Sequence, residues 1–196
     1  MLVLRMKTDR TGILAISTAR VLVASRRAEL ENIRADYVVP VPMHPLRRED
    51  RGVNSPDLLA EELAQQLKIP FARHLLRRVR RTDLQYTLSN QARAENVSDA
   101  FALRSPSLWQ RLLSIVLSIV NSIARTVANR KHQGTNKKVR GRGAAQFPDL
   151  SGKNIILVDD IFTTGATCNE VTKVLLSAGA RSVTVVAPAR AEGMRK

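Results

Sequence analysis

Residues 154–167 have the sequence NIILVDDIFTTGAT, which is the strongest indication of the fold class. It begins with an apolar run, residues 155–158, continues with Asp159 and Asp160, and ends in a turn rich in threonine. A continuous apolar run of this kind is typical of a central parallel strand that is covered on both faces. We therefore expect a buried strand over residues 154–159, with a loop at its carboxyl end.

A helix and another strand are predicted after this loop. Residues 167–177 have helical spacing, and Gly179 can supply the left-handed residue that ends a helix. Residues 182–187 are rich in valine and predict the next strand. Strand, loop, helix and strand within about thirty residues form a right-handed βαβ unit, which places ligands at the carboxyl ends of its strands.

The loop has the residue types of an anion site. It joins a strand to the first turn of a helix, where backbone N–H groups without helical partners and the helix dipole attract an anion. Glycine lets the backbone turn close to a ligand, and hydroxyl groups add donors without charge. The sequence therefore predicts that a phosphate binds to Thr163, Thr164, Gly165, Ala166 and Thr167.

Asp159 and Asp160 precede this predicted phosphate site. Because they are anions, we expect them to face hydroxyl groups or a hydrated cation and not the phosphate itself. A ribose 5-phosphate presents this combination, since its 2′- and 3′-hydroxyls can donate to the carboxylates. The plainer alternative is a polar strand end followed by an ordinary capping turn, but the whole ordered segment is more specific than either part.

A Walker B strand also ends in acidic residues, so it is a rival interpretation. It requires a second loop in which a glycine precedes a Gly-Lys-Ser or Gly-Lys-Thr triplet by five residues. Gly152 and Lys153 are followed by Asn154, and position 147 is Phe147. The sequence therefore excludes the Walker interpretation.

Composition limits the class of protein. A chain of 196 residues is long enough for one α/β domain and one appended element. Its single cysteine, Cys168, excludes an internal disulfide and a cysteine-rich zinc site, and favours a reducing compartment, the cytoplasm. Charged residues interrupt residues 1–10, so we expect no signal peptide.

The chain is strongly basic, with a net charge of +15 and a pI near 11.2. Such a charge predicts attraction to phosphorylated small molecules, nucleic acid or an anionic membrane surface, and does not choose among them.

The N-terminal half has helix and strand patterns that suit the same sheet. An apolar stripe at Ile13, Ile16, Ala19 and Val23 predicts a helix over residues 12–28. Valines closed by prolines predict a strand over residues 37–42.

A second helix is expected to begin at Asn54 or Ser55, with Pro56 in its first turn and leucines along one face. Residues 69–79 predict a further strand region, and residues 80–96 predict a polar loop.

Several motifs together resemble the ComF family of competence-associated, amidophosphoribosyltransferase-like proteins. Residues 156–167 resemble the phosphoribosyltransferase signature, and further similarities lie upstream in matching order and spacing. These are VPVPMHPLRR (residues 39–48), RGVN (residues 51–54), Gln85, Arg93, Asn96, Val97, Ala100 and Phe101.

This resemblance implies a phosphoribosyltransferase-like parallel sheet flanked by helices, which binds 5-phosphoribosyl-1-pyrophosphate. Arg47, Arg48 and Arg51 would hold the pyrophosphate, for which guanidinium groups are well suited, although a solvated arginine-rich turn is the alternative. Gln85 and Arg93 would belong to a lid over the reacting centre, although a disordered loop is equally compatible with this sequence.

The resemblance also implies the chemistry. Asp159 and Asp160 would bind the ribose hydroxyls, with Mg²⁺ bridging the ribose and the pyrophosphate. The reaction, one of nucleotide metabolism, would be displacement of pyrophosphate by a nitrogen acceptor that the sequence does not identify. The alternative is a non-catalytic DNA-uptake protein that uses the site as a ligand sensor and its basic surface for nucleic acid.

The chain departs from the family in two places. Members commonly carry a cysteine-rich zinc module, and with one cysteine we expect no zinc here. An insertion is predicted at residues 105–148, between the two parts of the domain, residues 1–104 and 149–196. It comprises an amphipathic helix, followed by a basic arm at residues 131–143.

The apolar face of the inserted helix needs a cover. It could pack on the domain or in a homodimer, dock on a membrane surface, or fill a partner's groove. A narrow polar stripe along this helix argues against a membrane span. The basic arm is either a solvated linker or a contact for nucleic acid or acidic lipid.

Overall fold

The computed structural model describes residues 9, 11–43, 54–80, 97–104, 120 and 148–190. The chain divides into two units, one formed by Met1–Arg104 with Asp149–Lys196 and the other by Ser105–Pro148. The inserted helix and basic arm that the sequence predicts lie outside the described residues, apart from Val120 and Pro148. The fold described below is that of the first unit.

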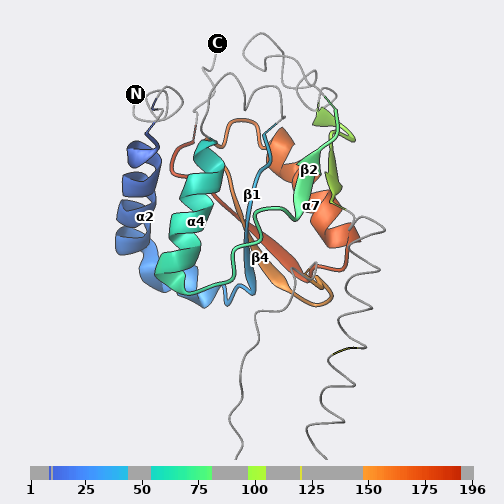
Figure 1. The fold of residues 1–196 in the computed structure, drawn as a ribbon, viewed down its shortest axis with the longest axis horizontal. Helices are drawn as coiled ribbons and strands as arrows, with labels where there is room; N and C mark the ends of the chain where they lie inside the picture. The colour runs from blue at the N-terminus through green and yellow to red at the C-terminus, as the bar shows by residue number, and fades with distance from the viewer. Residues whose placement is uncertain are drawn as a thin grey trace, which may run out of the picture. The chain divides into compact units, whose positions relative to one another are not determined.

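A parallel sheet forms the centre of this unit (Figure 1). Its strands are β1 (Tyr37–Pro40), β4 (Asn154–Val158) and β5 (Ser182–Val186), in the order β1-β4-β5. β4 pairs with both neighbours, and every residue from Ile155 to Val158 is at most 1% exposed. The prediction of a buried central parallel strand is confirmed.

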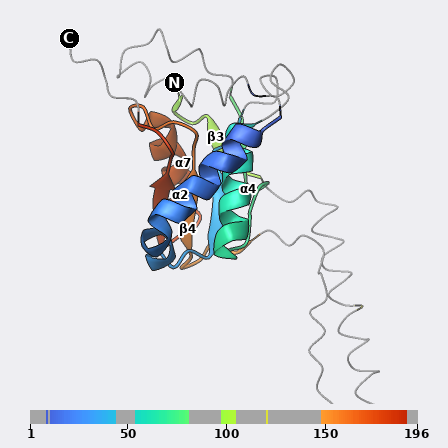
Figure 2. The ribbon, with the colours of Figure 1, turned by 90° about the vertical axis from the view of Figure 1, so that its left-hand side faces the viewer.

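Helices cover both faces of the sheet. Helices α2 (Ile13–Asn32) and α4 (Ser55–Leu67) lie side by side on one face, and α7 (Ala166–Ser177) lies on the other (Figures 1 and 2). Alternate residues of the strands, including Val38 and Ile156, form a shared core with α2 and α4. The predicted α/β class, a parallel sheet flanked by helices, is confirmed.

An antiparallel hairpin lies beside α7. It is formed by β2 (Leu76–Arg78) and β3 (Phe101–Leu103). The predicted strand region at residues 69–79 was too long, because a turn interrupts it after a single parallel bridge between Phe71 and Val38. Only its last part is a strand, and that strand pairs with β3 and not with the parallel sheet.

Helix α2 buries Ala19 and Val23 of the predicted stripe but not Ile13. Ile13 is 62% exposed, whereas Ala15, Ala19 and Val23 are at most 2% exposed. Small residues at four-residue spacing let α2 approach α4 closely, where Ala60 is fully buried. The prediction that Ile13 belongs to the buried stripe was therefore wrong, because closeness of packing and not side-chain size selects the buried face.

Polar contacts fix the edges of these layers. The Asp36 carboxylate accepts from the Asn154 backbone N–H (2.9 Å) and from the Lys153 ammonium (3.0 Å), and so joins the starts of β1 and β4. These hydrogen bonds hold the pKa of Asp36 below its ordinary value, the backbone donor having the largest effect. Arg20 Nε donates to Glu62 Oε1 at 2.8 Å and links α2 to α4.

In the part of the chain that the structure describes, no helix combines the length and apolar character needed to cross a membrane.

Candidate functional site

The predicted loop lies where β4 ends and α7 begins (Figure 1). Gly165 is the N-cap residue of α7 and has a φ of 78°, in the left-handed region that favours glycine. The carbonyl oxygen of Gly165 accepts from the Asn169 N–H at 2.8 Å, which closes the first turn of the helix. The chain therefore turns from strand to helix within a few residues.

Phe162 strongly favours glycine at this turn. A β-carbon on Gly165 would lie 2.7 Å from Cζ of the Phe162 ring, which is closer than real β-carbons approach other atoms. Gly165 is buried and Phe162 is half-buried, so the ring packs against the turn from one side. Phe162 had no predicted role in the site. A large aromatic three residues before a glycine was the only available signal.

The loop has donors that suit an anion. The N–H groups of the first helical turn have no carbonyl partner within the helix, and the positive end of the helix dipole lies there. Thr164 is exposed, and its hydroxyl oxygen accepts from the Ala166 N–H in a long contact of 3.5 Å. Thr163, Ala166 and Thr167 are half-buried. This combination of backbone donors, hydroxyls and exposure can hold a phosphate.

The two acids after β4 have different surroundings. Asp159 is 9% exposed, and its Oδ1 accepts from the Asp160 backbone N–H at 2.8 Å. Asp160 is half-buried and so remains more accessible than Asp159. Burial, and next the nearby Asp160 carboxylate, raise the pKa of Asp159 to about 7. The pair therefore consists of an inner acid and an outer acid.

Cys168 lies against the inner acid. Its Sγ donates to Asp159 Oδ2 at 3.6 Å, and the residue is 2% exposed. Burial, and then the Asp159 carboxylate, raise the pKa of the Cys168 thiol to about 12. This environment does not agree with a thiol activated by the start of the helix. Cys168 is a packing residue that also orients Asp159.

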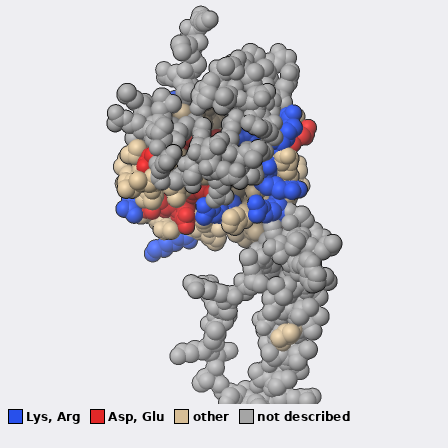
Figure 3. All heavy atoms as spheres, turned by 45° about the horizontal axis from the view of Figure 1, so that its top comes forward, with Lys and Arg blue, Asp and Glu red and all other residues tan. Residues whose placement is uncertain are grey.

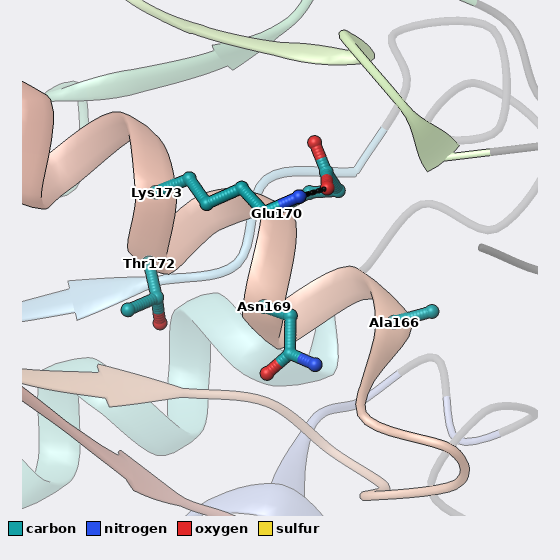
Figure 4. A pocket seen from close by; sticks show the side chains of 5 residues that line it. All are labelled: Ala166, Asn169, Glu170, Thr172 and Lys173. Carbon is teal, nitrogen blue, oxygen red and sulfur yellow. Dashed lines mark hydrogen bonds and ion pairs between the residues drawn. The ribbon is translucent and has the colours of Figure 1, made fainter. Parts of the chain in front are cut away.

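A pocket of about 360 Å³ lies along α7. Its described lining comprises Ala166, Asn169, Glu170, Thr172 and Lys173 (Figure 4). Lys173 Nζ pairs with Glu170 Oε1 at 2.5 Å. Ala166 is the only described lining residue that also belongs to the loop, so this pocket borders the predicted phosphate site on its helical side.

Other predicted site residues lie outside the described part of the chain. These are Arg47, Arg48, Arg51, Gln85 and Arg93. Among the described residues, no three His, Cys, Asp or Glu side chains gather into a group that could hold a metal ion. A cation at this site would therefore need oxygens from a ligand or water in addition to Asp159 and Asp160.

A parallel sheet whose central strand ends in two acids, followed by a glycine-containing turn into a helix, is an arrangement of α/β domains that bind ligands at the carboxyl ends of their strands. The model of the phosphoribosyl transferase domain matches residues 58–196. The chain belongs to this family.

The predicted resemblance to the ComF family is confirmed by curated relatives. Competence protein F of Haemophilus influenzae is 29% identical over 156 residues, covering 80% of this chain and 51% of that protein. DNA utilization protein YhgH of Salmonella typhimurium is 28% identical over 190 residues, covering 94% of this chain and 64% of that protein. The chain thus spans between half and two thirds of the length of these relatives.

Solved structures with some similarity include a phosphoribosylpyrophosphate synthetase from Mycobacterium smegmatis. It is 14% identical with a TM-score of 0.41, and the match covers 88% of this chain and 33% of that one. TT1426 from Thermus thermophilus is 18% identical with a TM-score of 0.36, and the match covers 96% of this chain and 86% of that one.

The buried inner acid predicts a pH-dependent stability. A carboxyl group whose pKa rises from 3.8 to about 7 on folding stabilises the protein fully at low pH, and this contribution is lost as pH rises through 7. Asp159→Asn removes the ionisation and keeps an oxygen that can accept from Asp160. Between pH 4 and pH 8 we expect the free energy of unfolding of the wild type, measured in urea, to fall by up to roughly 4 kcal/mol relative to that of Asp159→Asn. Parallel pH profiles for the two proteins would contradict the assigned burial.

The close contact at Gly165 predicts an unequal cost of two alanine substitutions. Gly152 has a similar φ of 68° but open space around its β-carbon position, so Gly152→Ala incurs backbone strain alone. Gly165→Ala also displaces the Phe162 ring and should lower the free energy of unfolding by about 1–3 kcal/mol more than Gly152→Ala. Phe162→Leu in the Gly165→Ala background should recover part of that difference. Equal costs at both glycines, measured by urea denaturation, would show that the ring does not restrict the turn.

Proposed function

We propose that this chain binds 5-phosphoribosyl-1-pyrophosphate and transfers its phosphoribosyl group to a nitrogen acceptor. The observation that carries the proposal is the glycine-containing turn at residues 163–167, which begins three residues after the half-buried Asp160. A phosphate and a pair of sugar hydroxyls are separated by only a few atoms in a ribose 5-phosphate. A ligand of this size suits an anion site with a carboxylate close by in the chain.

Each part of the ligand has a proposed partner. The 5′-phosphate would accept from the backbone and hydroxyl groups of residues 163–167. Asp160 would accept from the ribose hydroxyls, and Asp159, held behind it, would support the same end of the sugar. Arg47, Arg48 and Arg51 would hold the pyrophosphate, and Gln85 and Arg93 would close over the site, as the family resemblance implies.

Magnesium fits this arrangement as a cation bound largely through the ligand. Mg²⁺ commonly uses one or two protein carboxylates and completes its octahedron with water and phosphate oxygens. Asp159 and Asp160 provide carboxylates at the carboxyl end of β4, and the described residues offer no third protein ligand. When bound, the ion would neutralise charge on the pyrophosphate leaving group.

The proposed reaction breaks the bond between the ribose anomeric carbon and pyrophosphate and forms one to nitrogen. Positive charge grows on the sugar ring while negative charge grows on the leaving group. Asp160, close to the ring, would stabilise the former charge, and the arginines would stabilise the latter. No covalent protein nucleophile is required, which agrees with the unactivated Cys168 thiol.

A second candidate is a non-catalytic role in DNA uptake, with the same site sensing the ligand. It is supported by relatives named Competence protein F and DNA utilization protein, and by the net charge of +15. Basic side chains lie on several parts of the described surface in Figure 3, and Arg77 and Arg104 of the hairpin region are exposed. Both candidates are compatible with a reducing, cytoplasmic environment for the buried thiol.

Calorimetric titration with phosphoribosyl pyrophosphate and Mg²⁺ tests ligand binding. We expect Asp160→Asn to weaken binding by roughly 10–100-fold, because a charge-assisted hydrogen bond to a ribose hydroxyl is lost. Asp149→Asn is the matched control, since Asp149 is an exposed acid just before β4, at the opposite end of that strand. Equal affinities for the two variants would remove the proposed role of Asp160.

Pyrophosphate release over a panel of nitrogenous acceptors separates the two candidates. Release with any acceptor supports the transferase. Tight binding without release under every acceptor, together with DNA binding that weakens steeply with salt, favours the sensor.

A further inference from the structure

The predicted phosphate-binding loop, residues 163–167, carries no positive side chain of its own. Between residues 159 and 169 the only charged side chains are those of Asp159 and Asp160. A phosphate bound there would lie close to carboxylates, with only backbone dipoles and hydroxyls to offset the repulsion. A cation from another part of the fold would therefore strengthen the site considerably.

Parallel pairing brings one arginine to this loop. Beyond the ends of β4 and β5 the pairing resumes as an isolated parallel bridge between Phe162 and Arg190. The Phe162 N–H donates to the Ala189 carbonyl oxygen at 2.8 Å. The segment that follows β5 is thus fixed against the first residues of the loop, at the carboxyl edge of the sheet.

The Phe162 ring touches both the loop and this arginine. The guanidinium carbon of Arg190 lies 5.9 Å from the ring centroid, in a cation–π contact. The tip of the same ring packs against Gly165, where its Cζ restricts the turn. The Phe162 ring thus contacts the loop at Gly165 and the guanidinium group of Arg190, and so links the two.

Arg190 is exposed and, within the described residues, forms no ion pair with a carboxylate. Stacking on an aromatic face leaves the N–H edge of a guanidinium group open to a ligand. That edge matches two oxygens of a phosphate group, which an ammonium group cannot do.

We propose that Arg190, positioned by stacking on Phe162, is a phosphate-binding residue of this site and gives it selectivity for the phosphorylated sugar. The inference rests on the proposed function, because it assigns the cation that the ligand's 5′-phosphate meets. Arg190 supplies charge, Phe162 sets where that charge lies, and the loop supplies the backbone donors.

The test compares charge-removing substitutions at both ends of one strand. Arg190→Gln keeps a planar polar group over the ring and removes the charge. Arg181→Gln removes the same charge from an exposed residue just before β5, at the amino end of the sheet. Arg190→Lys keeps the charge without the two-pronged geometry. The probe is ribose 5-phosphate, titrated calorimetrically at two salt concentrations.

We expect Arg190→Gln to bind ribose 5-phosphate about tenfold more weakly than the wild type, with a shallower salt dependence. Arg181→Gln should bind within about twofold of the wild type, and Arg190→Lys should lie between these two variants. If Arg190 only stacked on the ring, Arg190→Lys and Arg190→Gln would bind ribose 5-phosphate with equal affinity.

The possible outcomes distinguish a failure of the role of Arg190 from a failure of the proposed function. If the wild type binds ribose 5-phosphate and Arg190→Gln matches Arg181→Gln, the role of Arg190 is wrong while the proposed function stands. If the wild type binds neither ribose 5-phosphate nor phosphoribosyl pyrophosphate, the proposed function fails and takes this inference with it. Because Arg190 is exposed, thermal unfolding should be nearly unchanged, and an Arg190→Lys variant that binds as weakly as Arg190→Gln would also contradict the role of its charge.

Discussion

The contact between the Phe162 ring and Gly165 is the constraint on which the rest of the site depends. A residue with a β-carbon cannot take this left-handed position without displacing the ring. Because the turn is tight, the end of β4 and the start of α7 lie next to each other. Carboxylates from the strand and backbone donors from the helix are therefore presented at one edge of the sheet, as a phosphorylated sugar requires.

Burial divides the acid pair into different tasks. Asp159 is enclosed by the start of α7, where it meets the Cys168 thiol and the backbone of its neighbour. Such an environment disfavours the charged form and fixes the side chain. Asp160, on the next residue, lies close enough to raise the pKa of Asp159, but the residue is only half-buried. The core thus holds one acid in place and leaves the other more accessible to a ligand.

The sequence was sufficient to predict the elements whose patterns are strong and local. The apolar run at residues 155–158 is typical of a buried strand, and the glycine-containing turn after it favours the start of a helix. The predictions that failed depended on tertiary contacts. Ile13 looked like a core residue because it is large, but α2 approaches α4 through Ala15 and Ala19. Residues 69–79 looked like one strand, but most of the pairing partners lie in a separate hairpin with β3.

The same distinction applies to the site. The loop and its acids were predictable because they form one continuous motif. The contact of Cys168 with Asp159 and the placement of Arg190 beside Phe162 were not, because each depends on how neighbouring elements pack in three dimensions. No periodicity or spacing in the sequence reports the parallel bridge that brings Arg190 to the loop.

The most direct test of the central claim is an NMR titration of the backbone amides with ribose 5-phosphate, compared with unphosphorylated ribose. We expect the amides of residues 163–168 to shift strongly and saturably with ribose 5-phosphate and hardly at all with ribose. If the phosphorylated sugar leaves these amides unchanged while shifting amides elsewhere in the domain, the turn after β4 does not bind the phosphate.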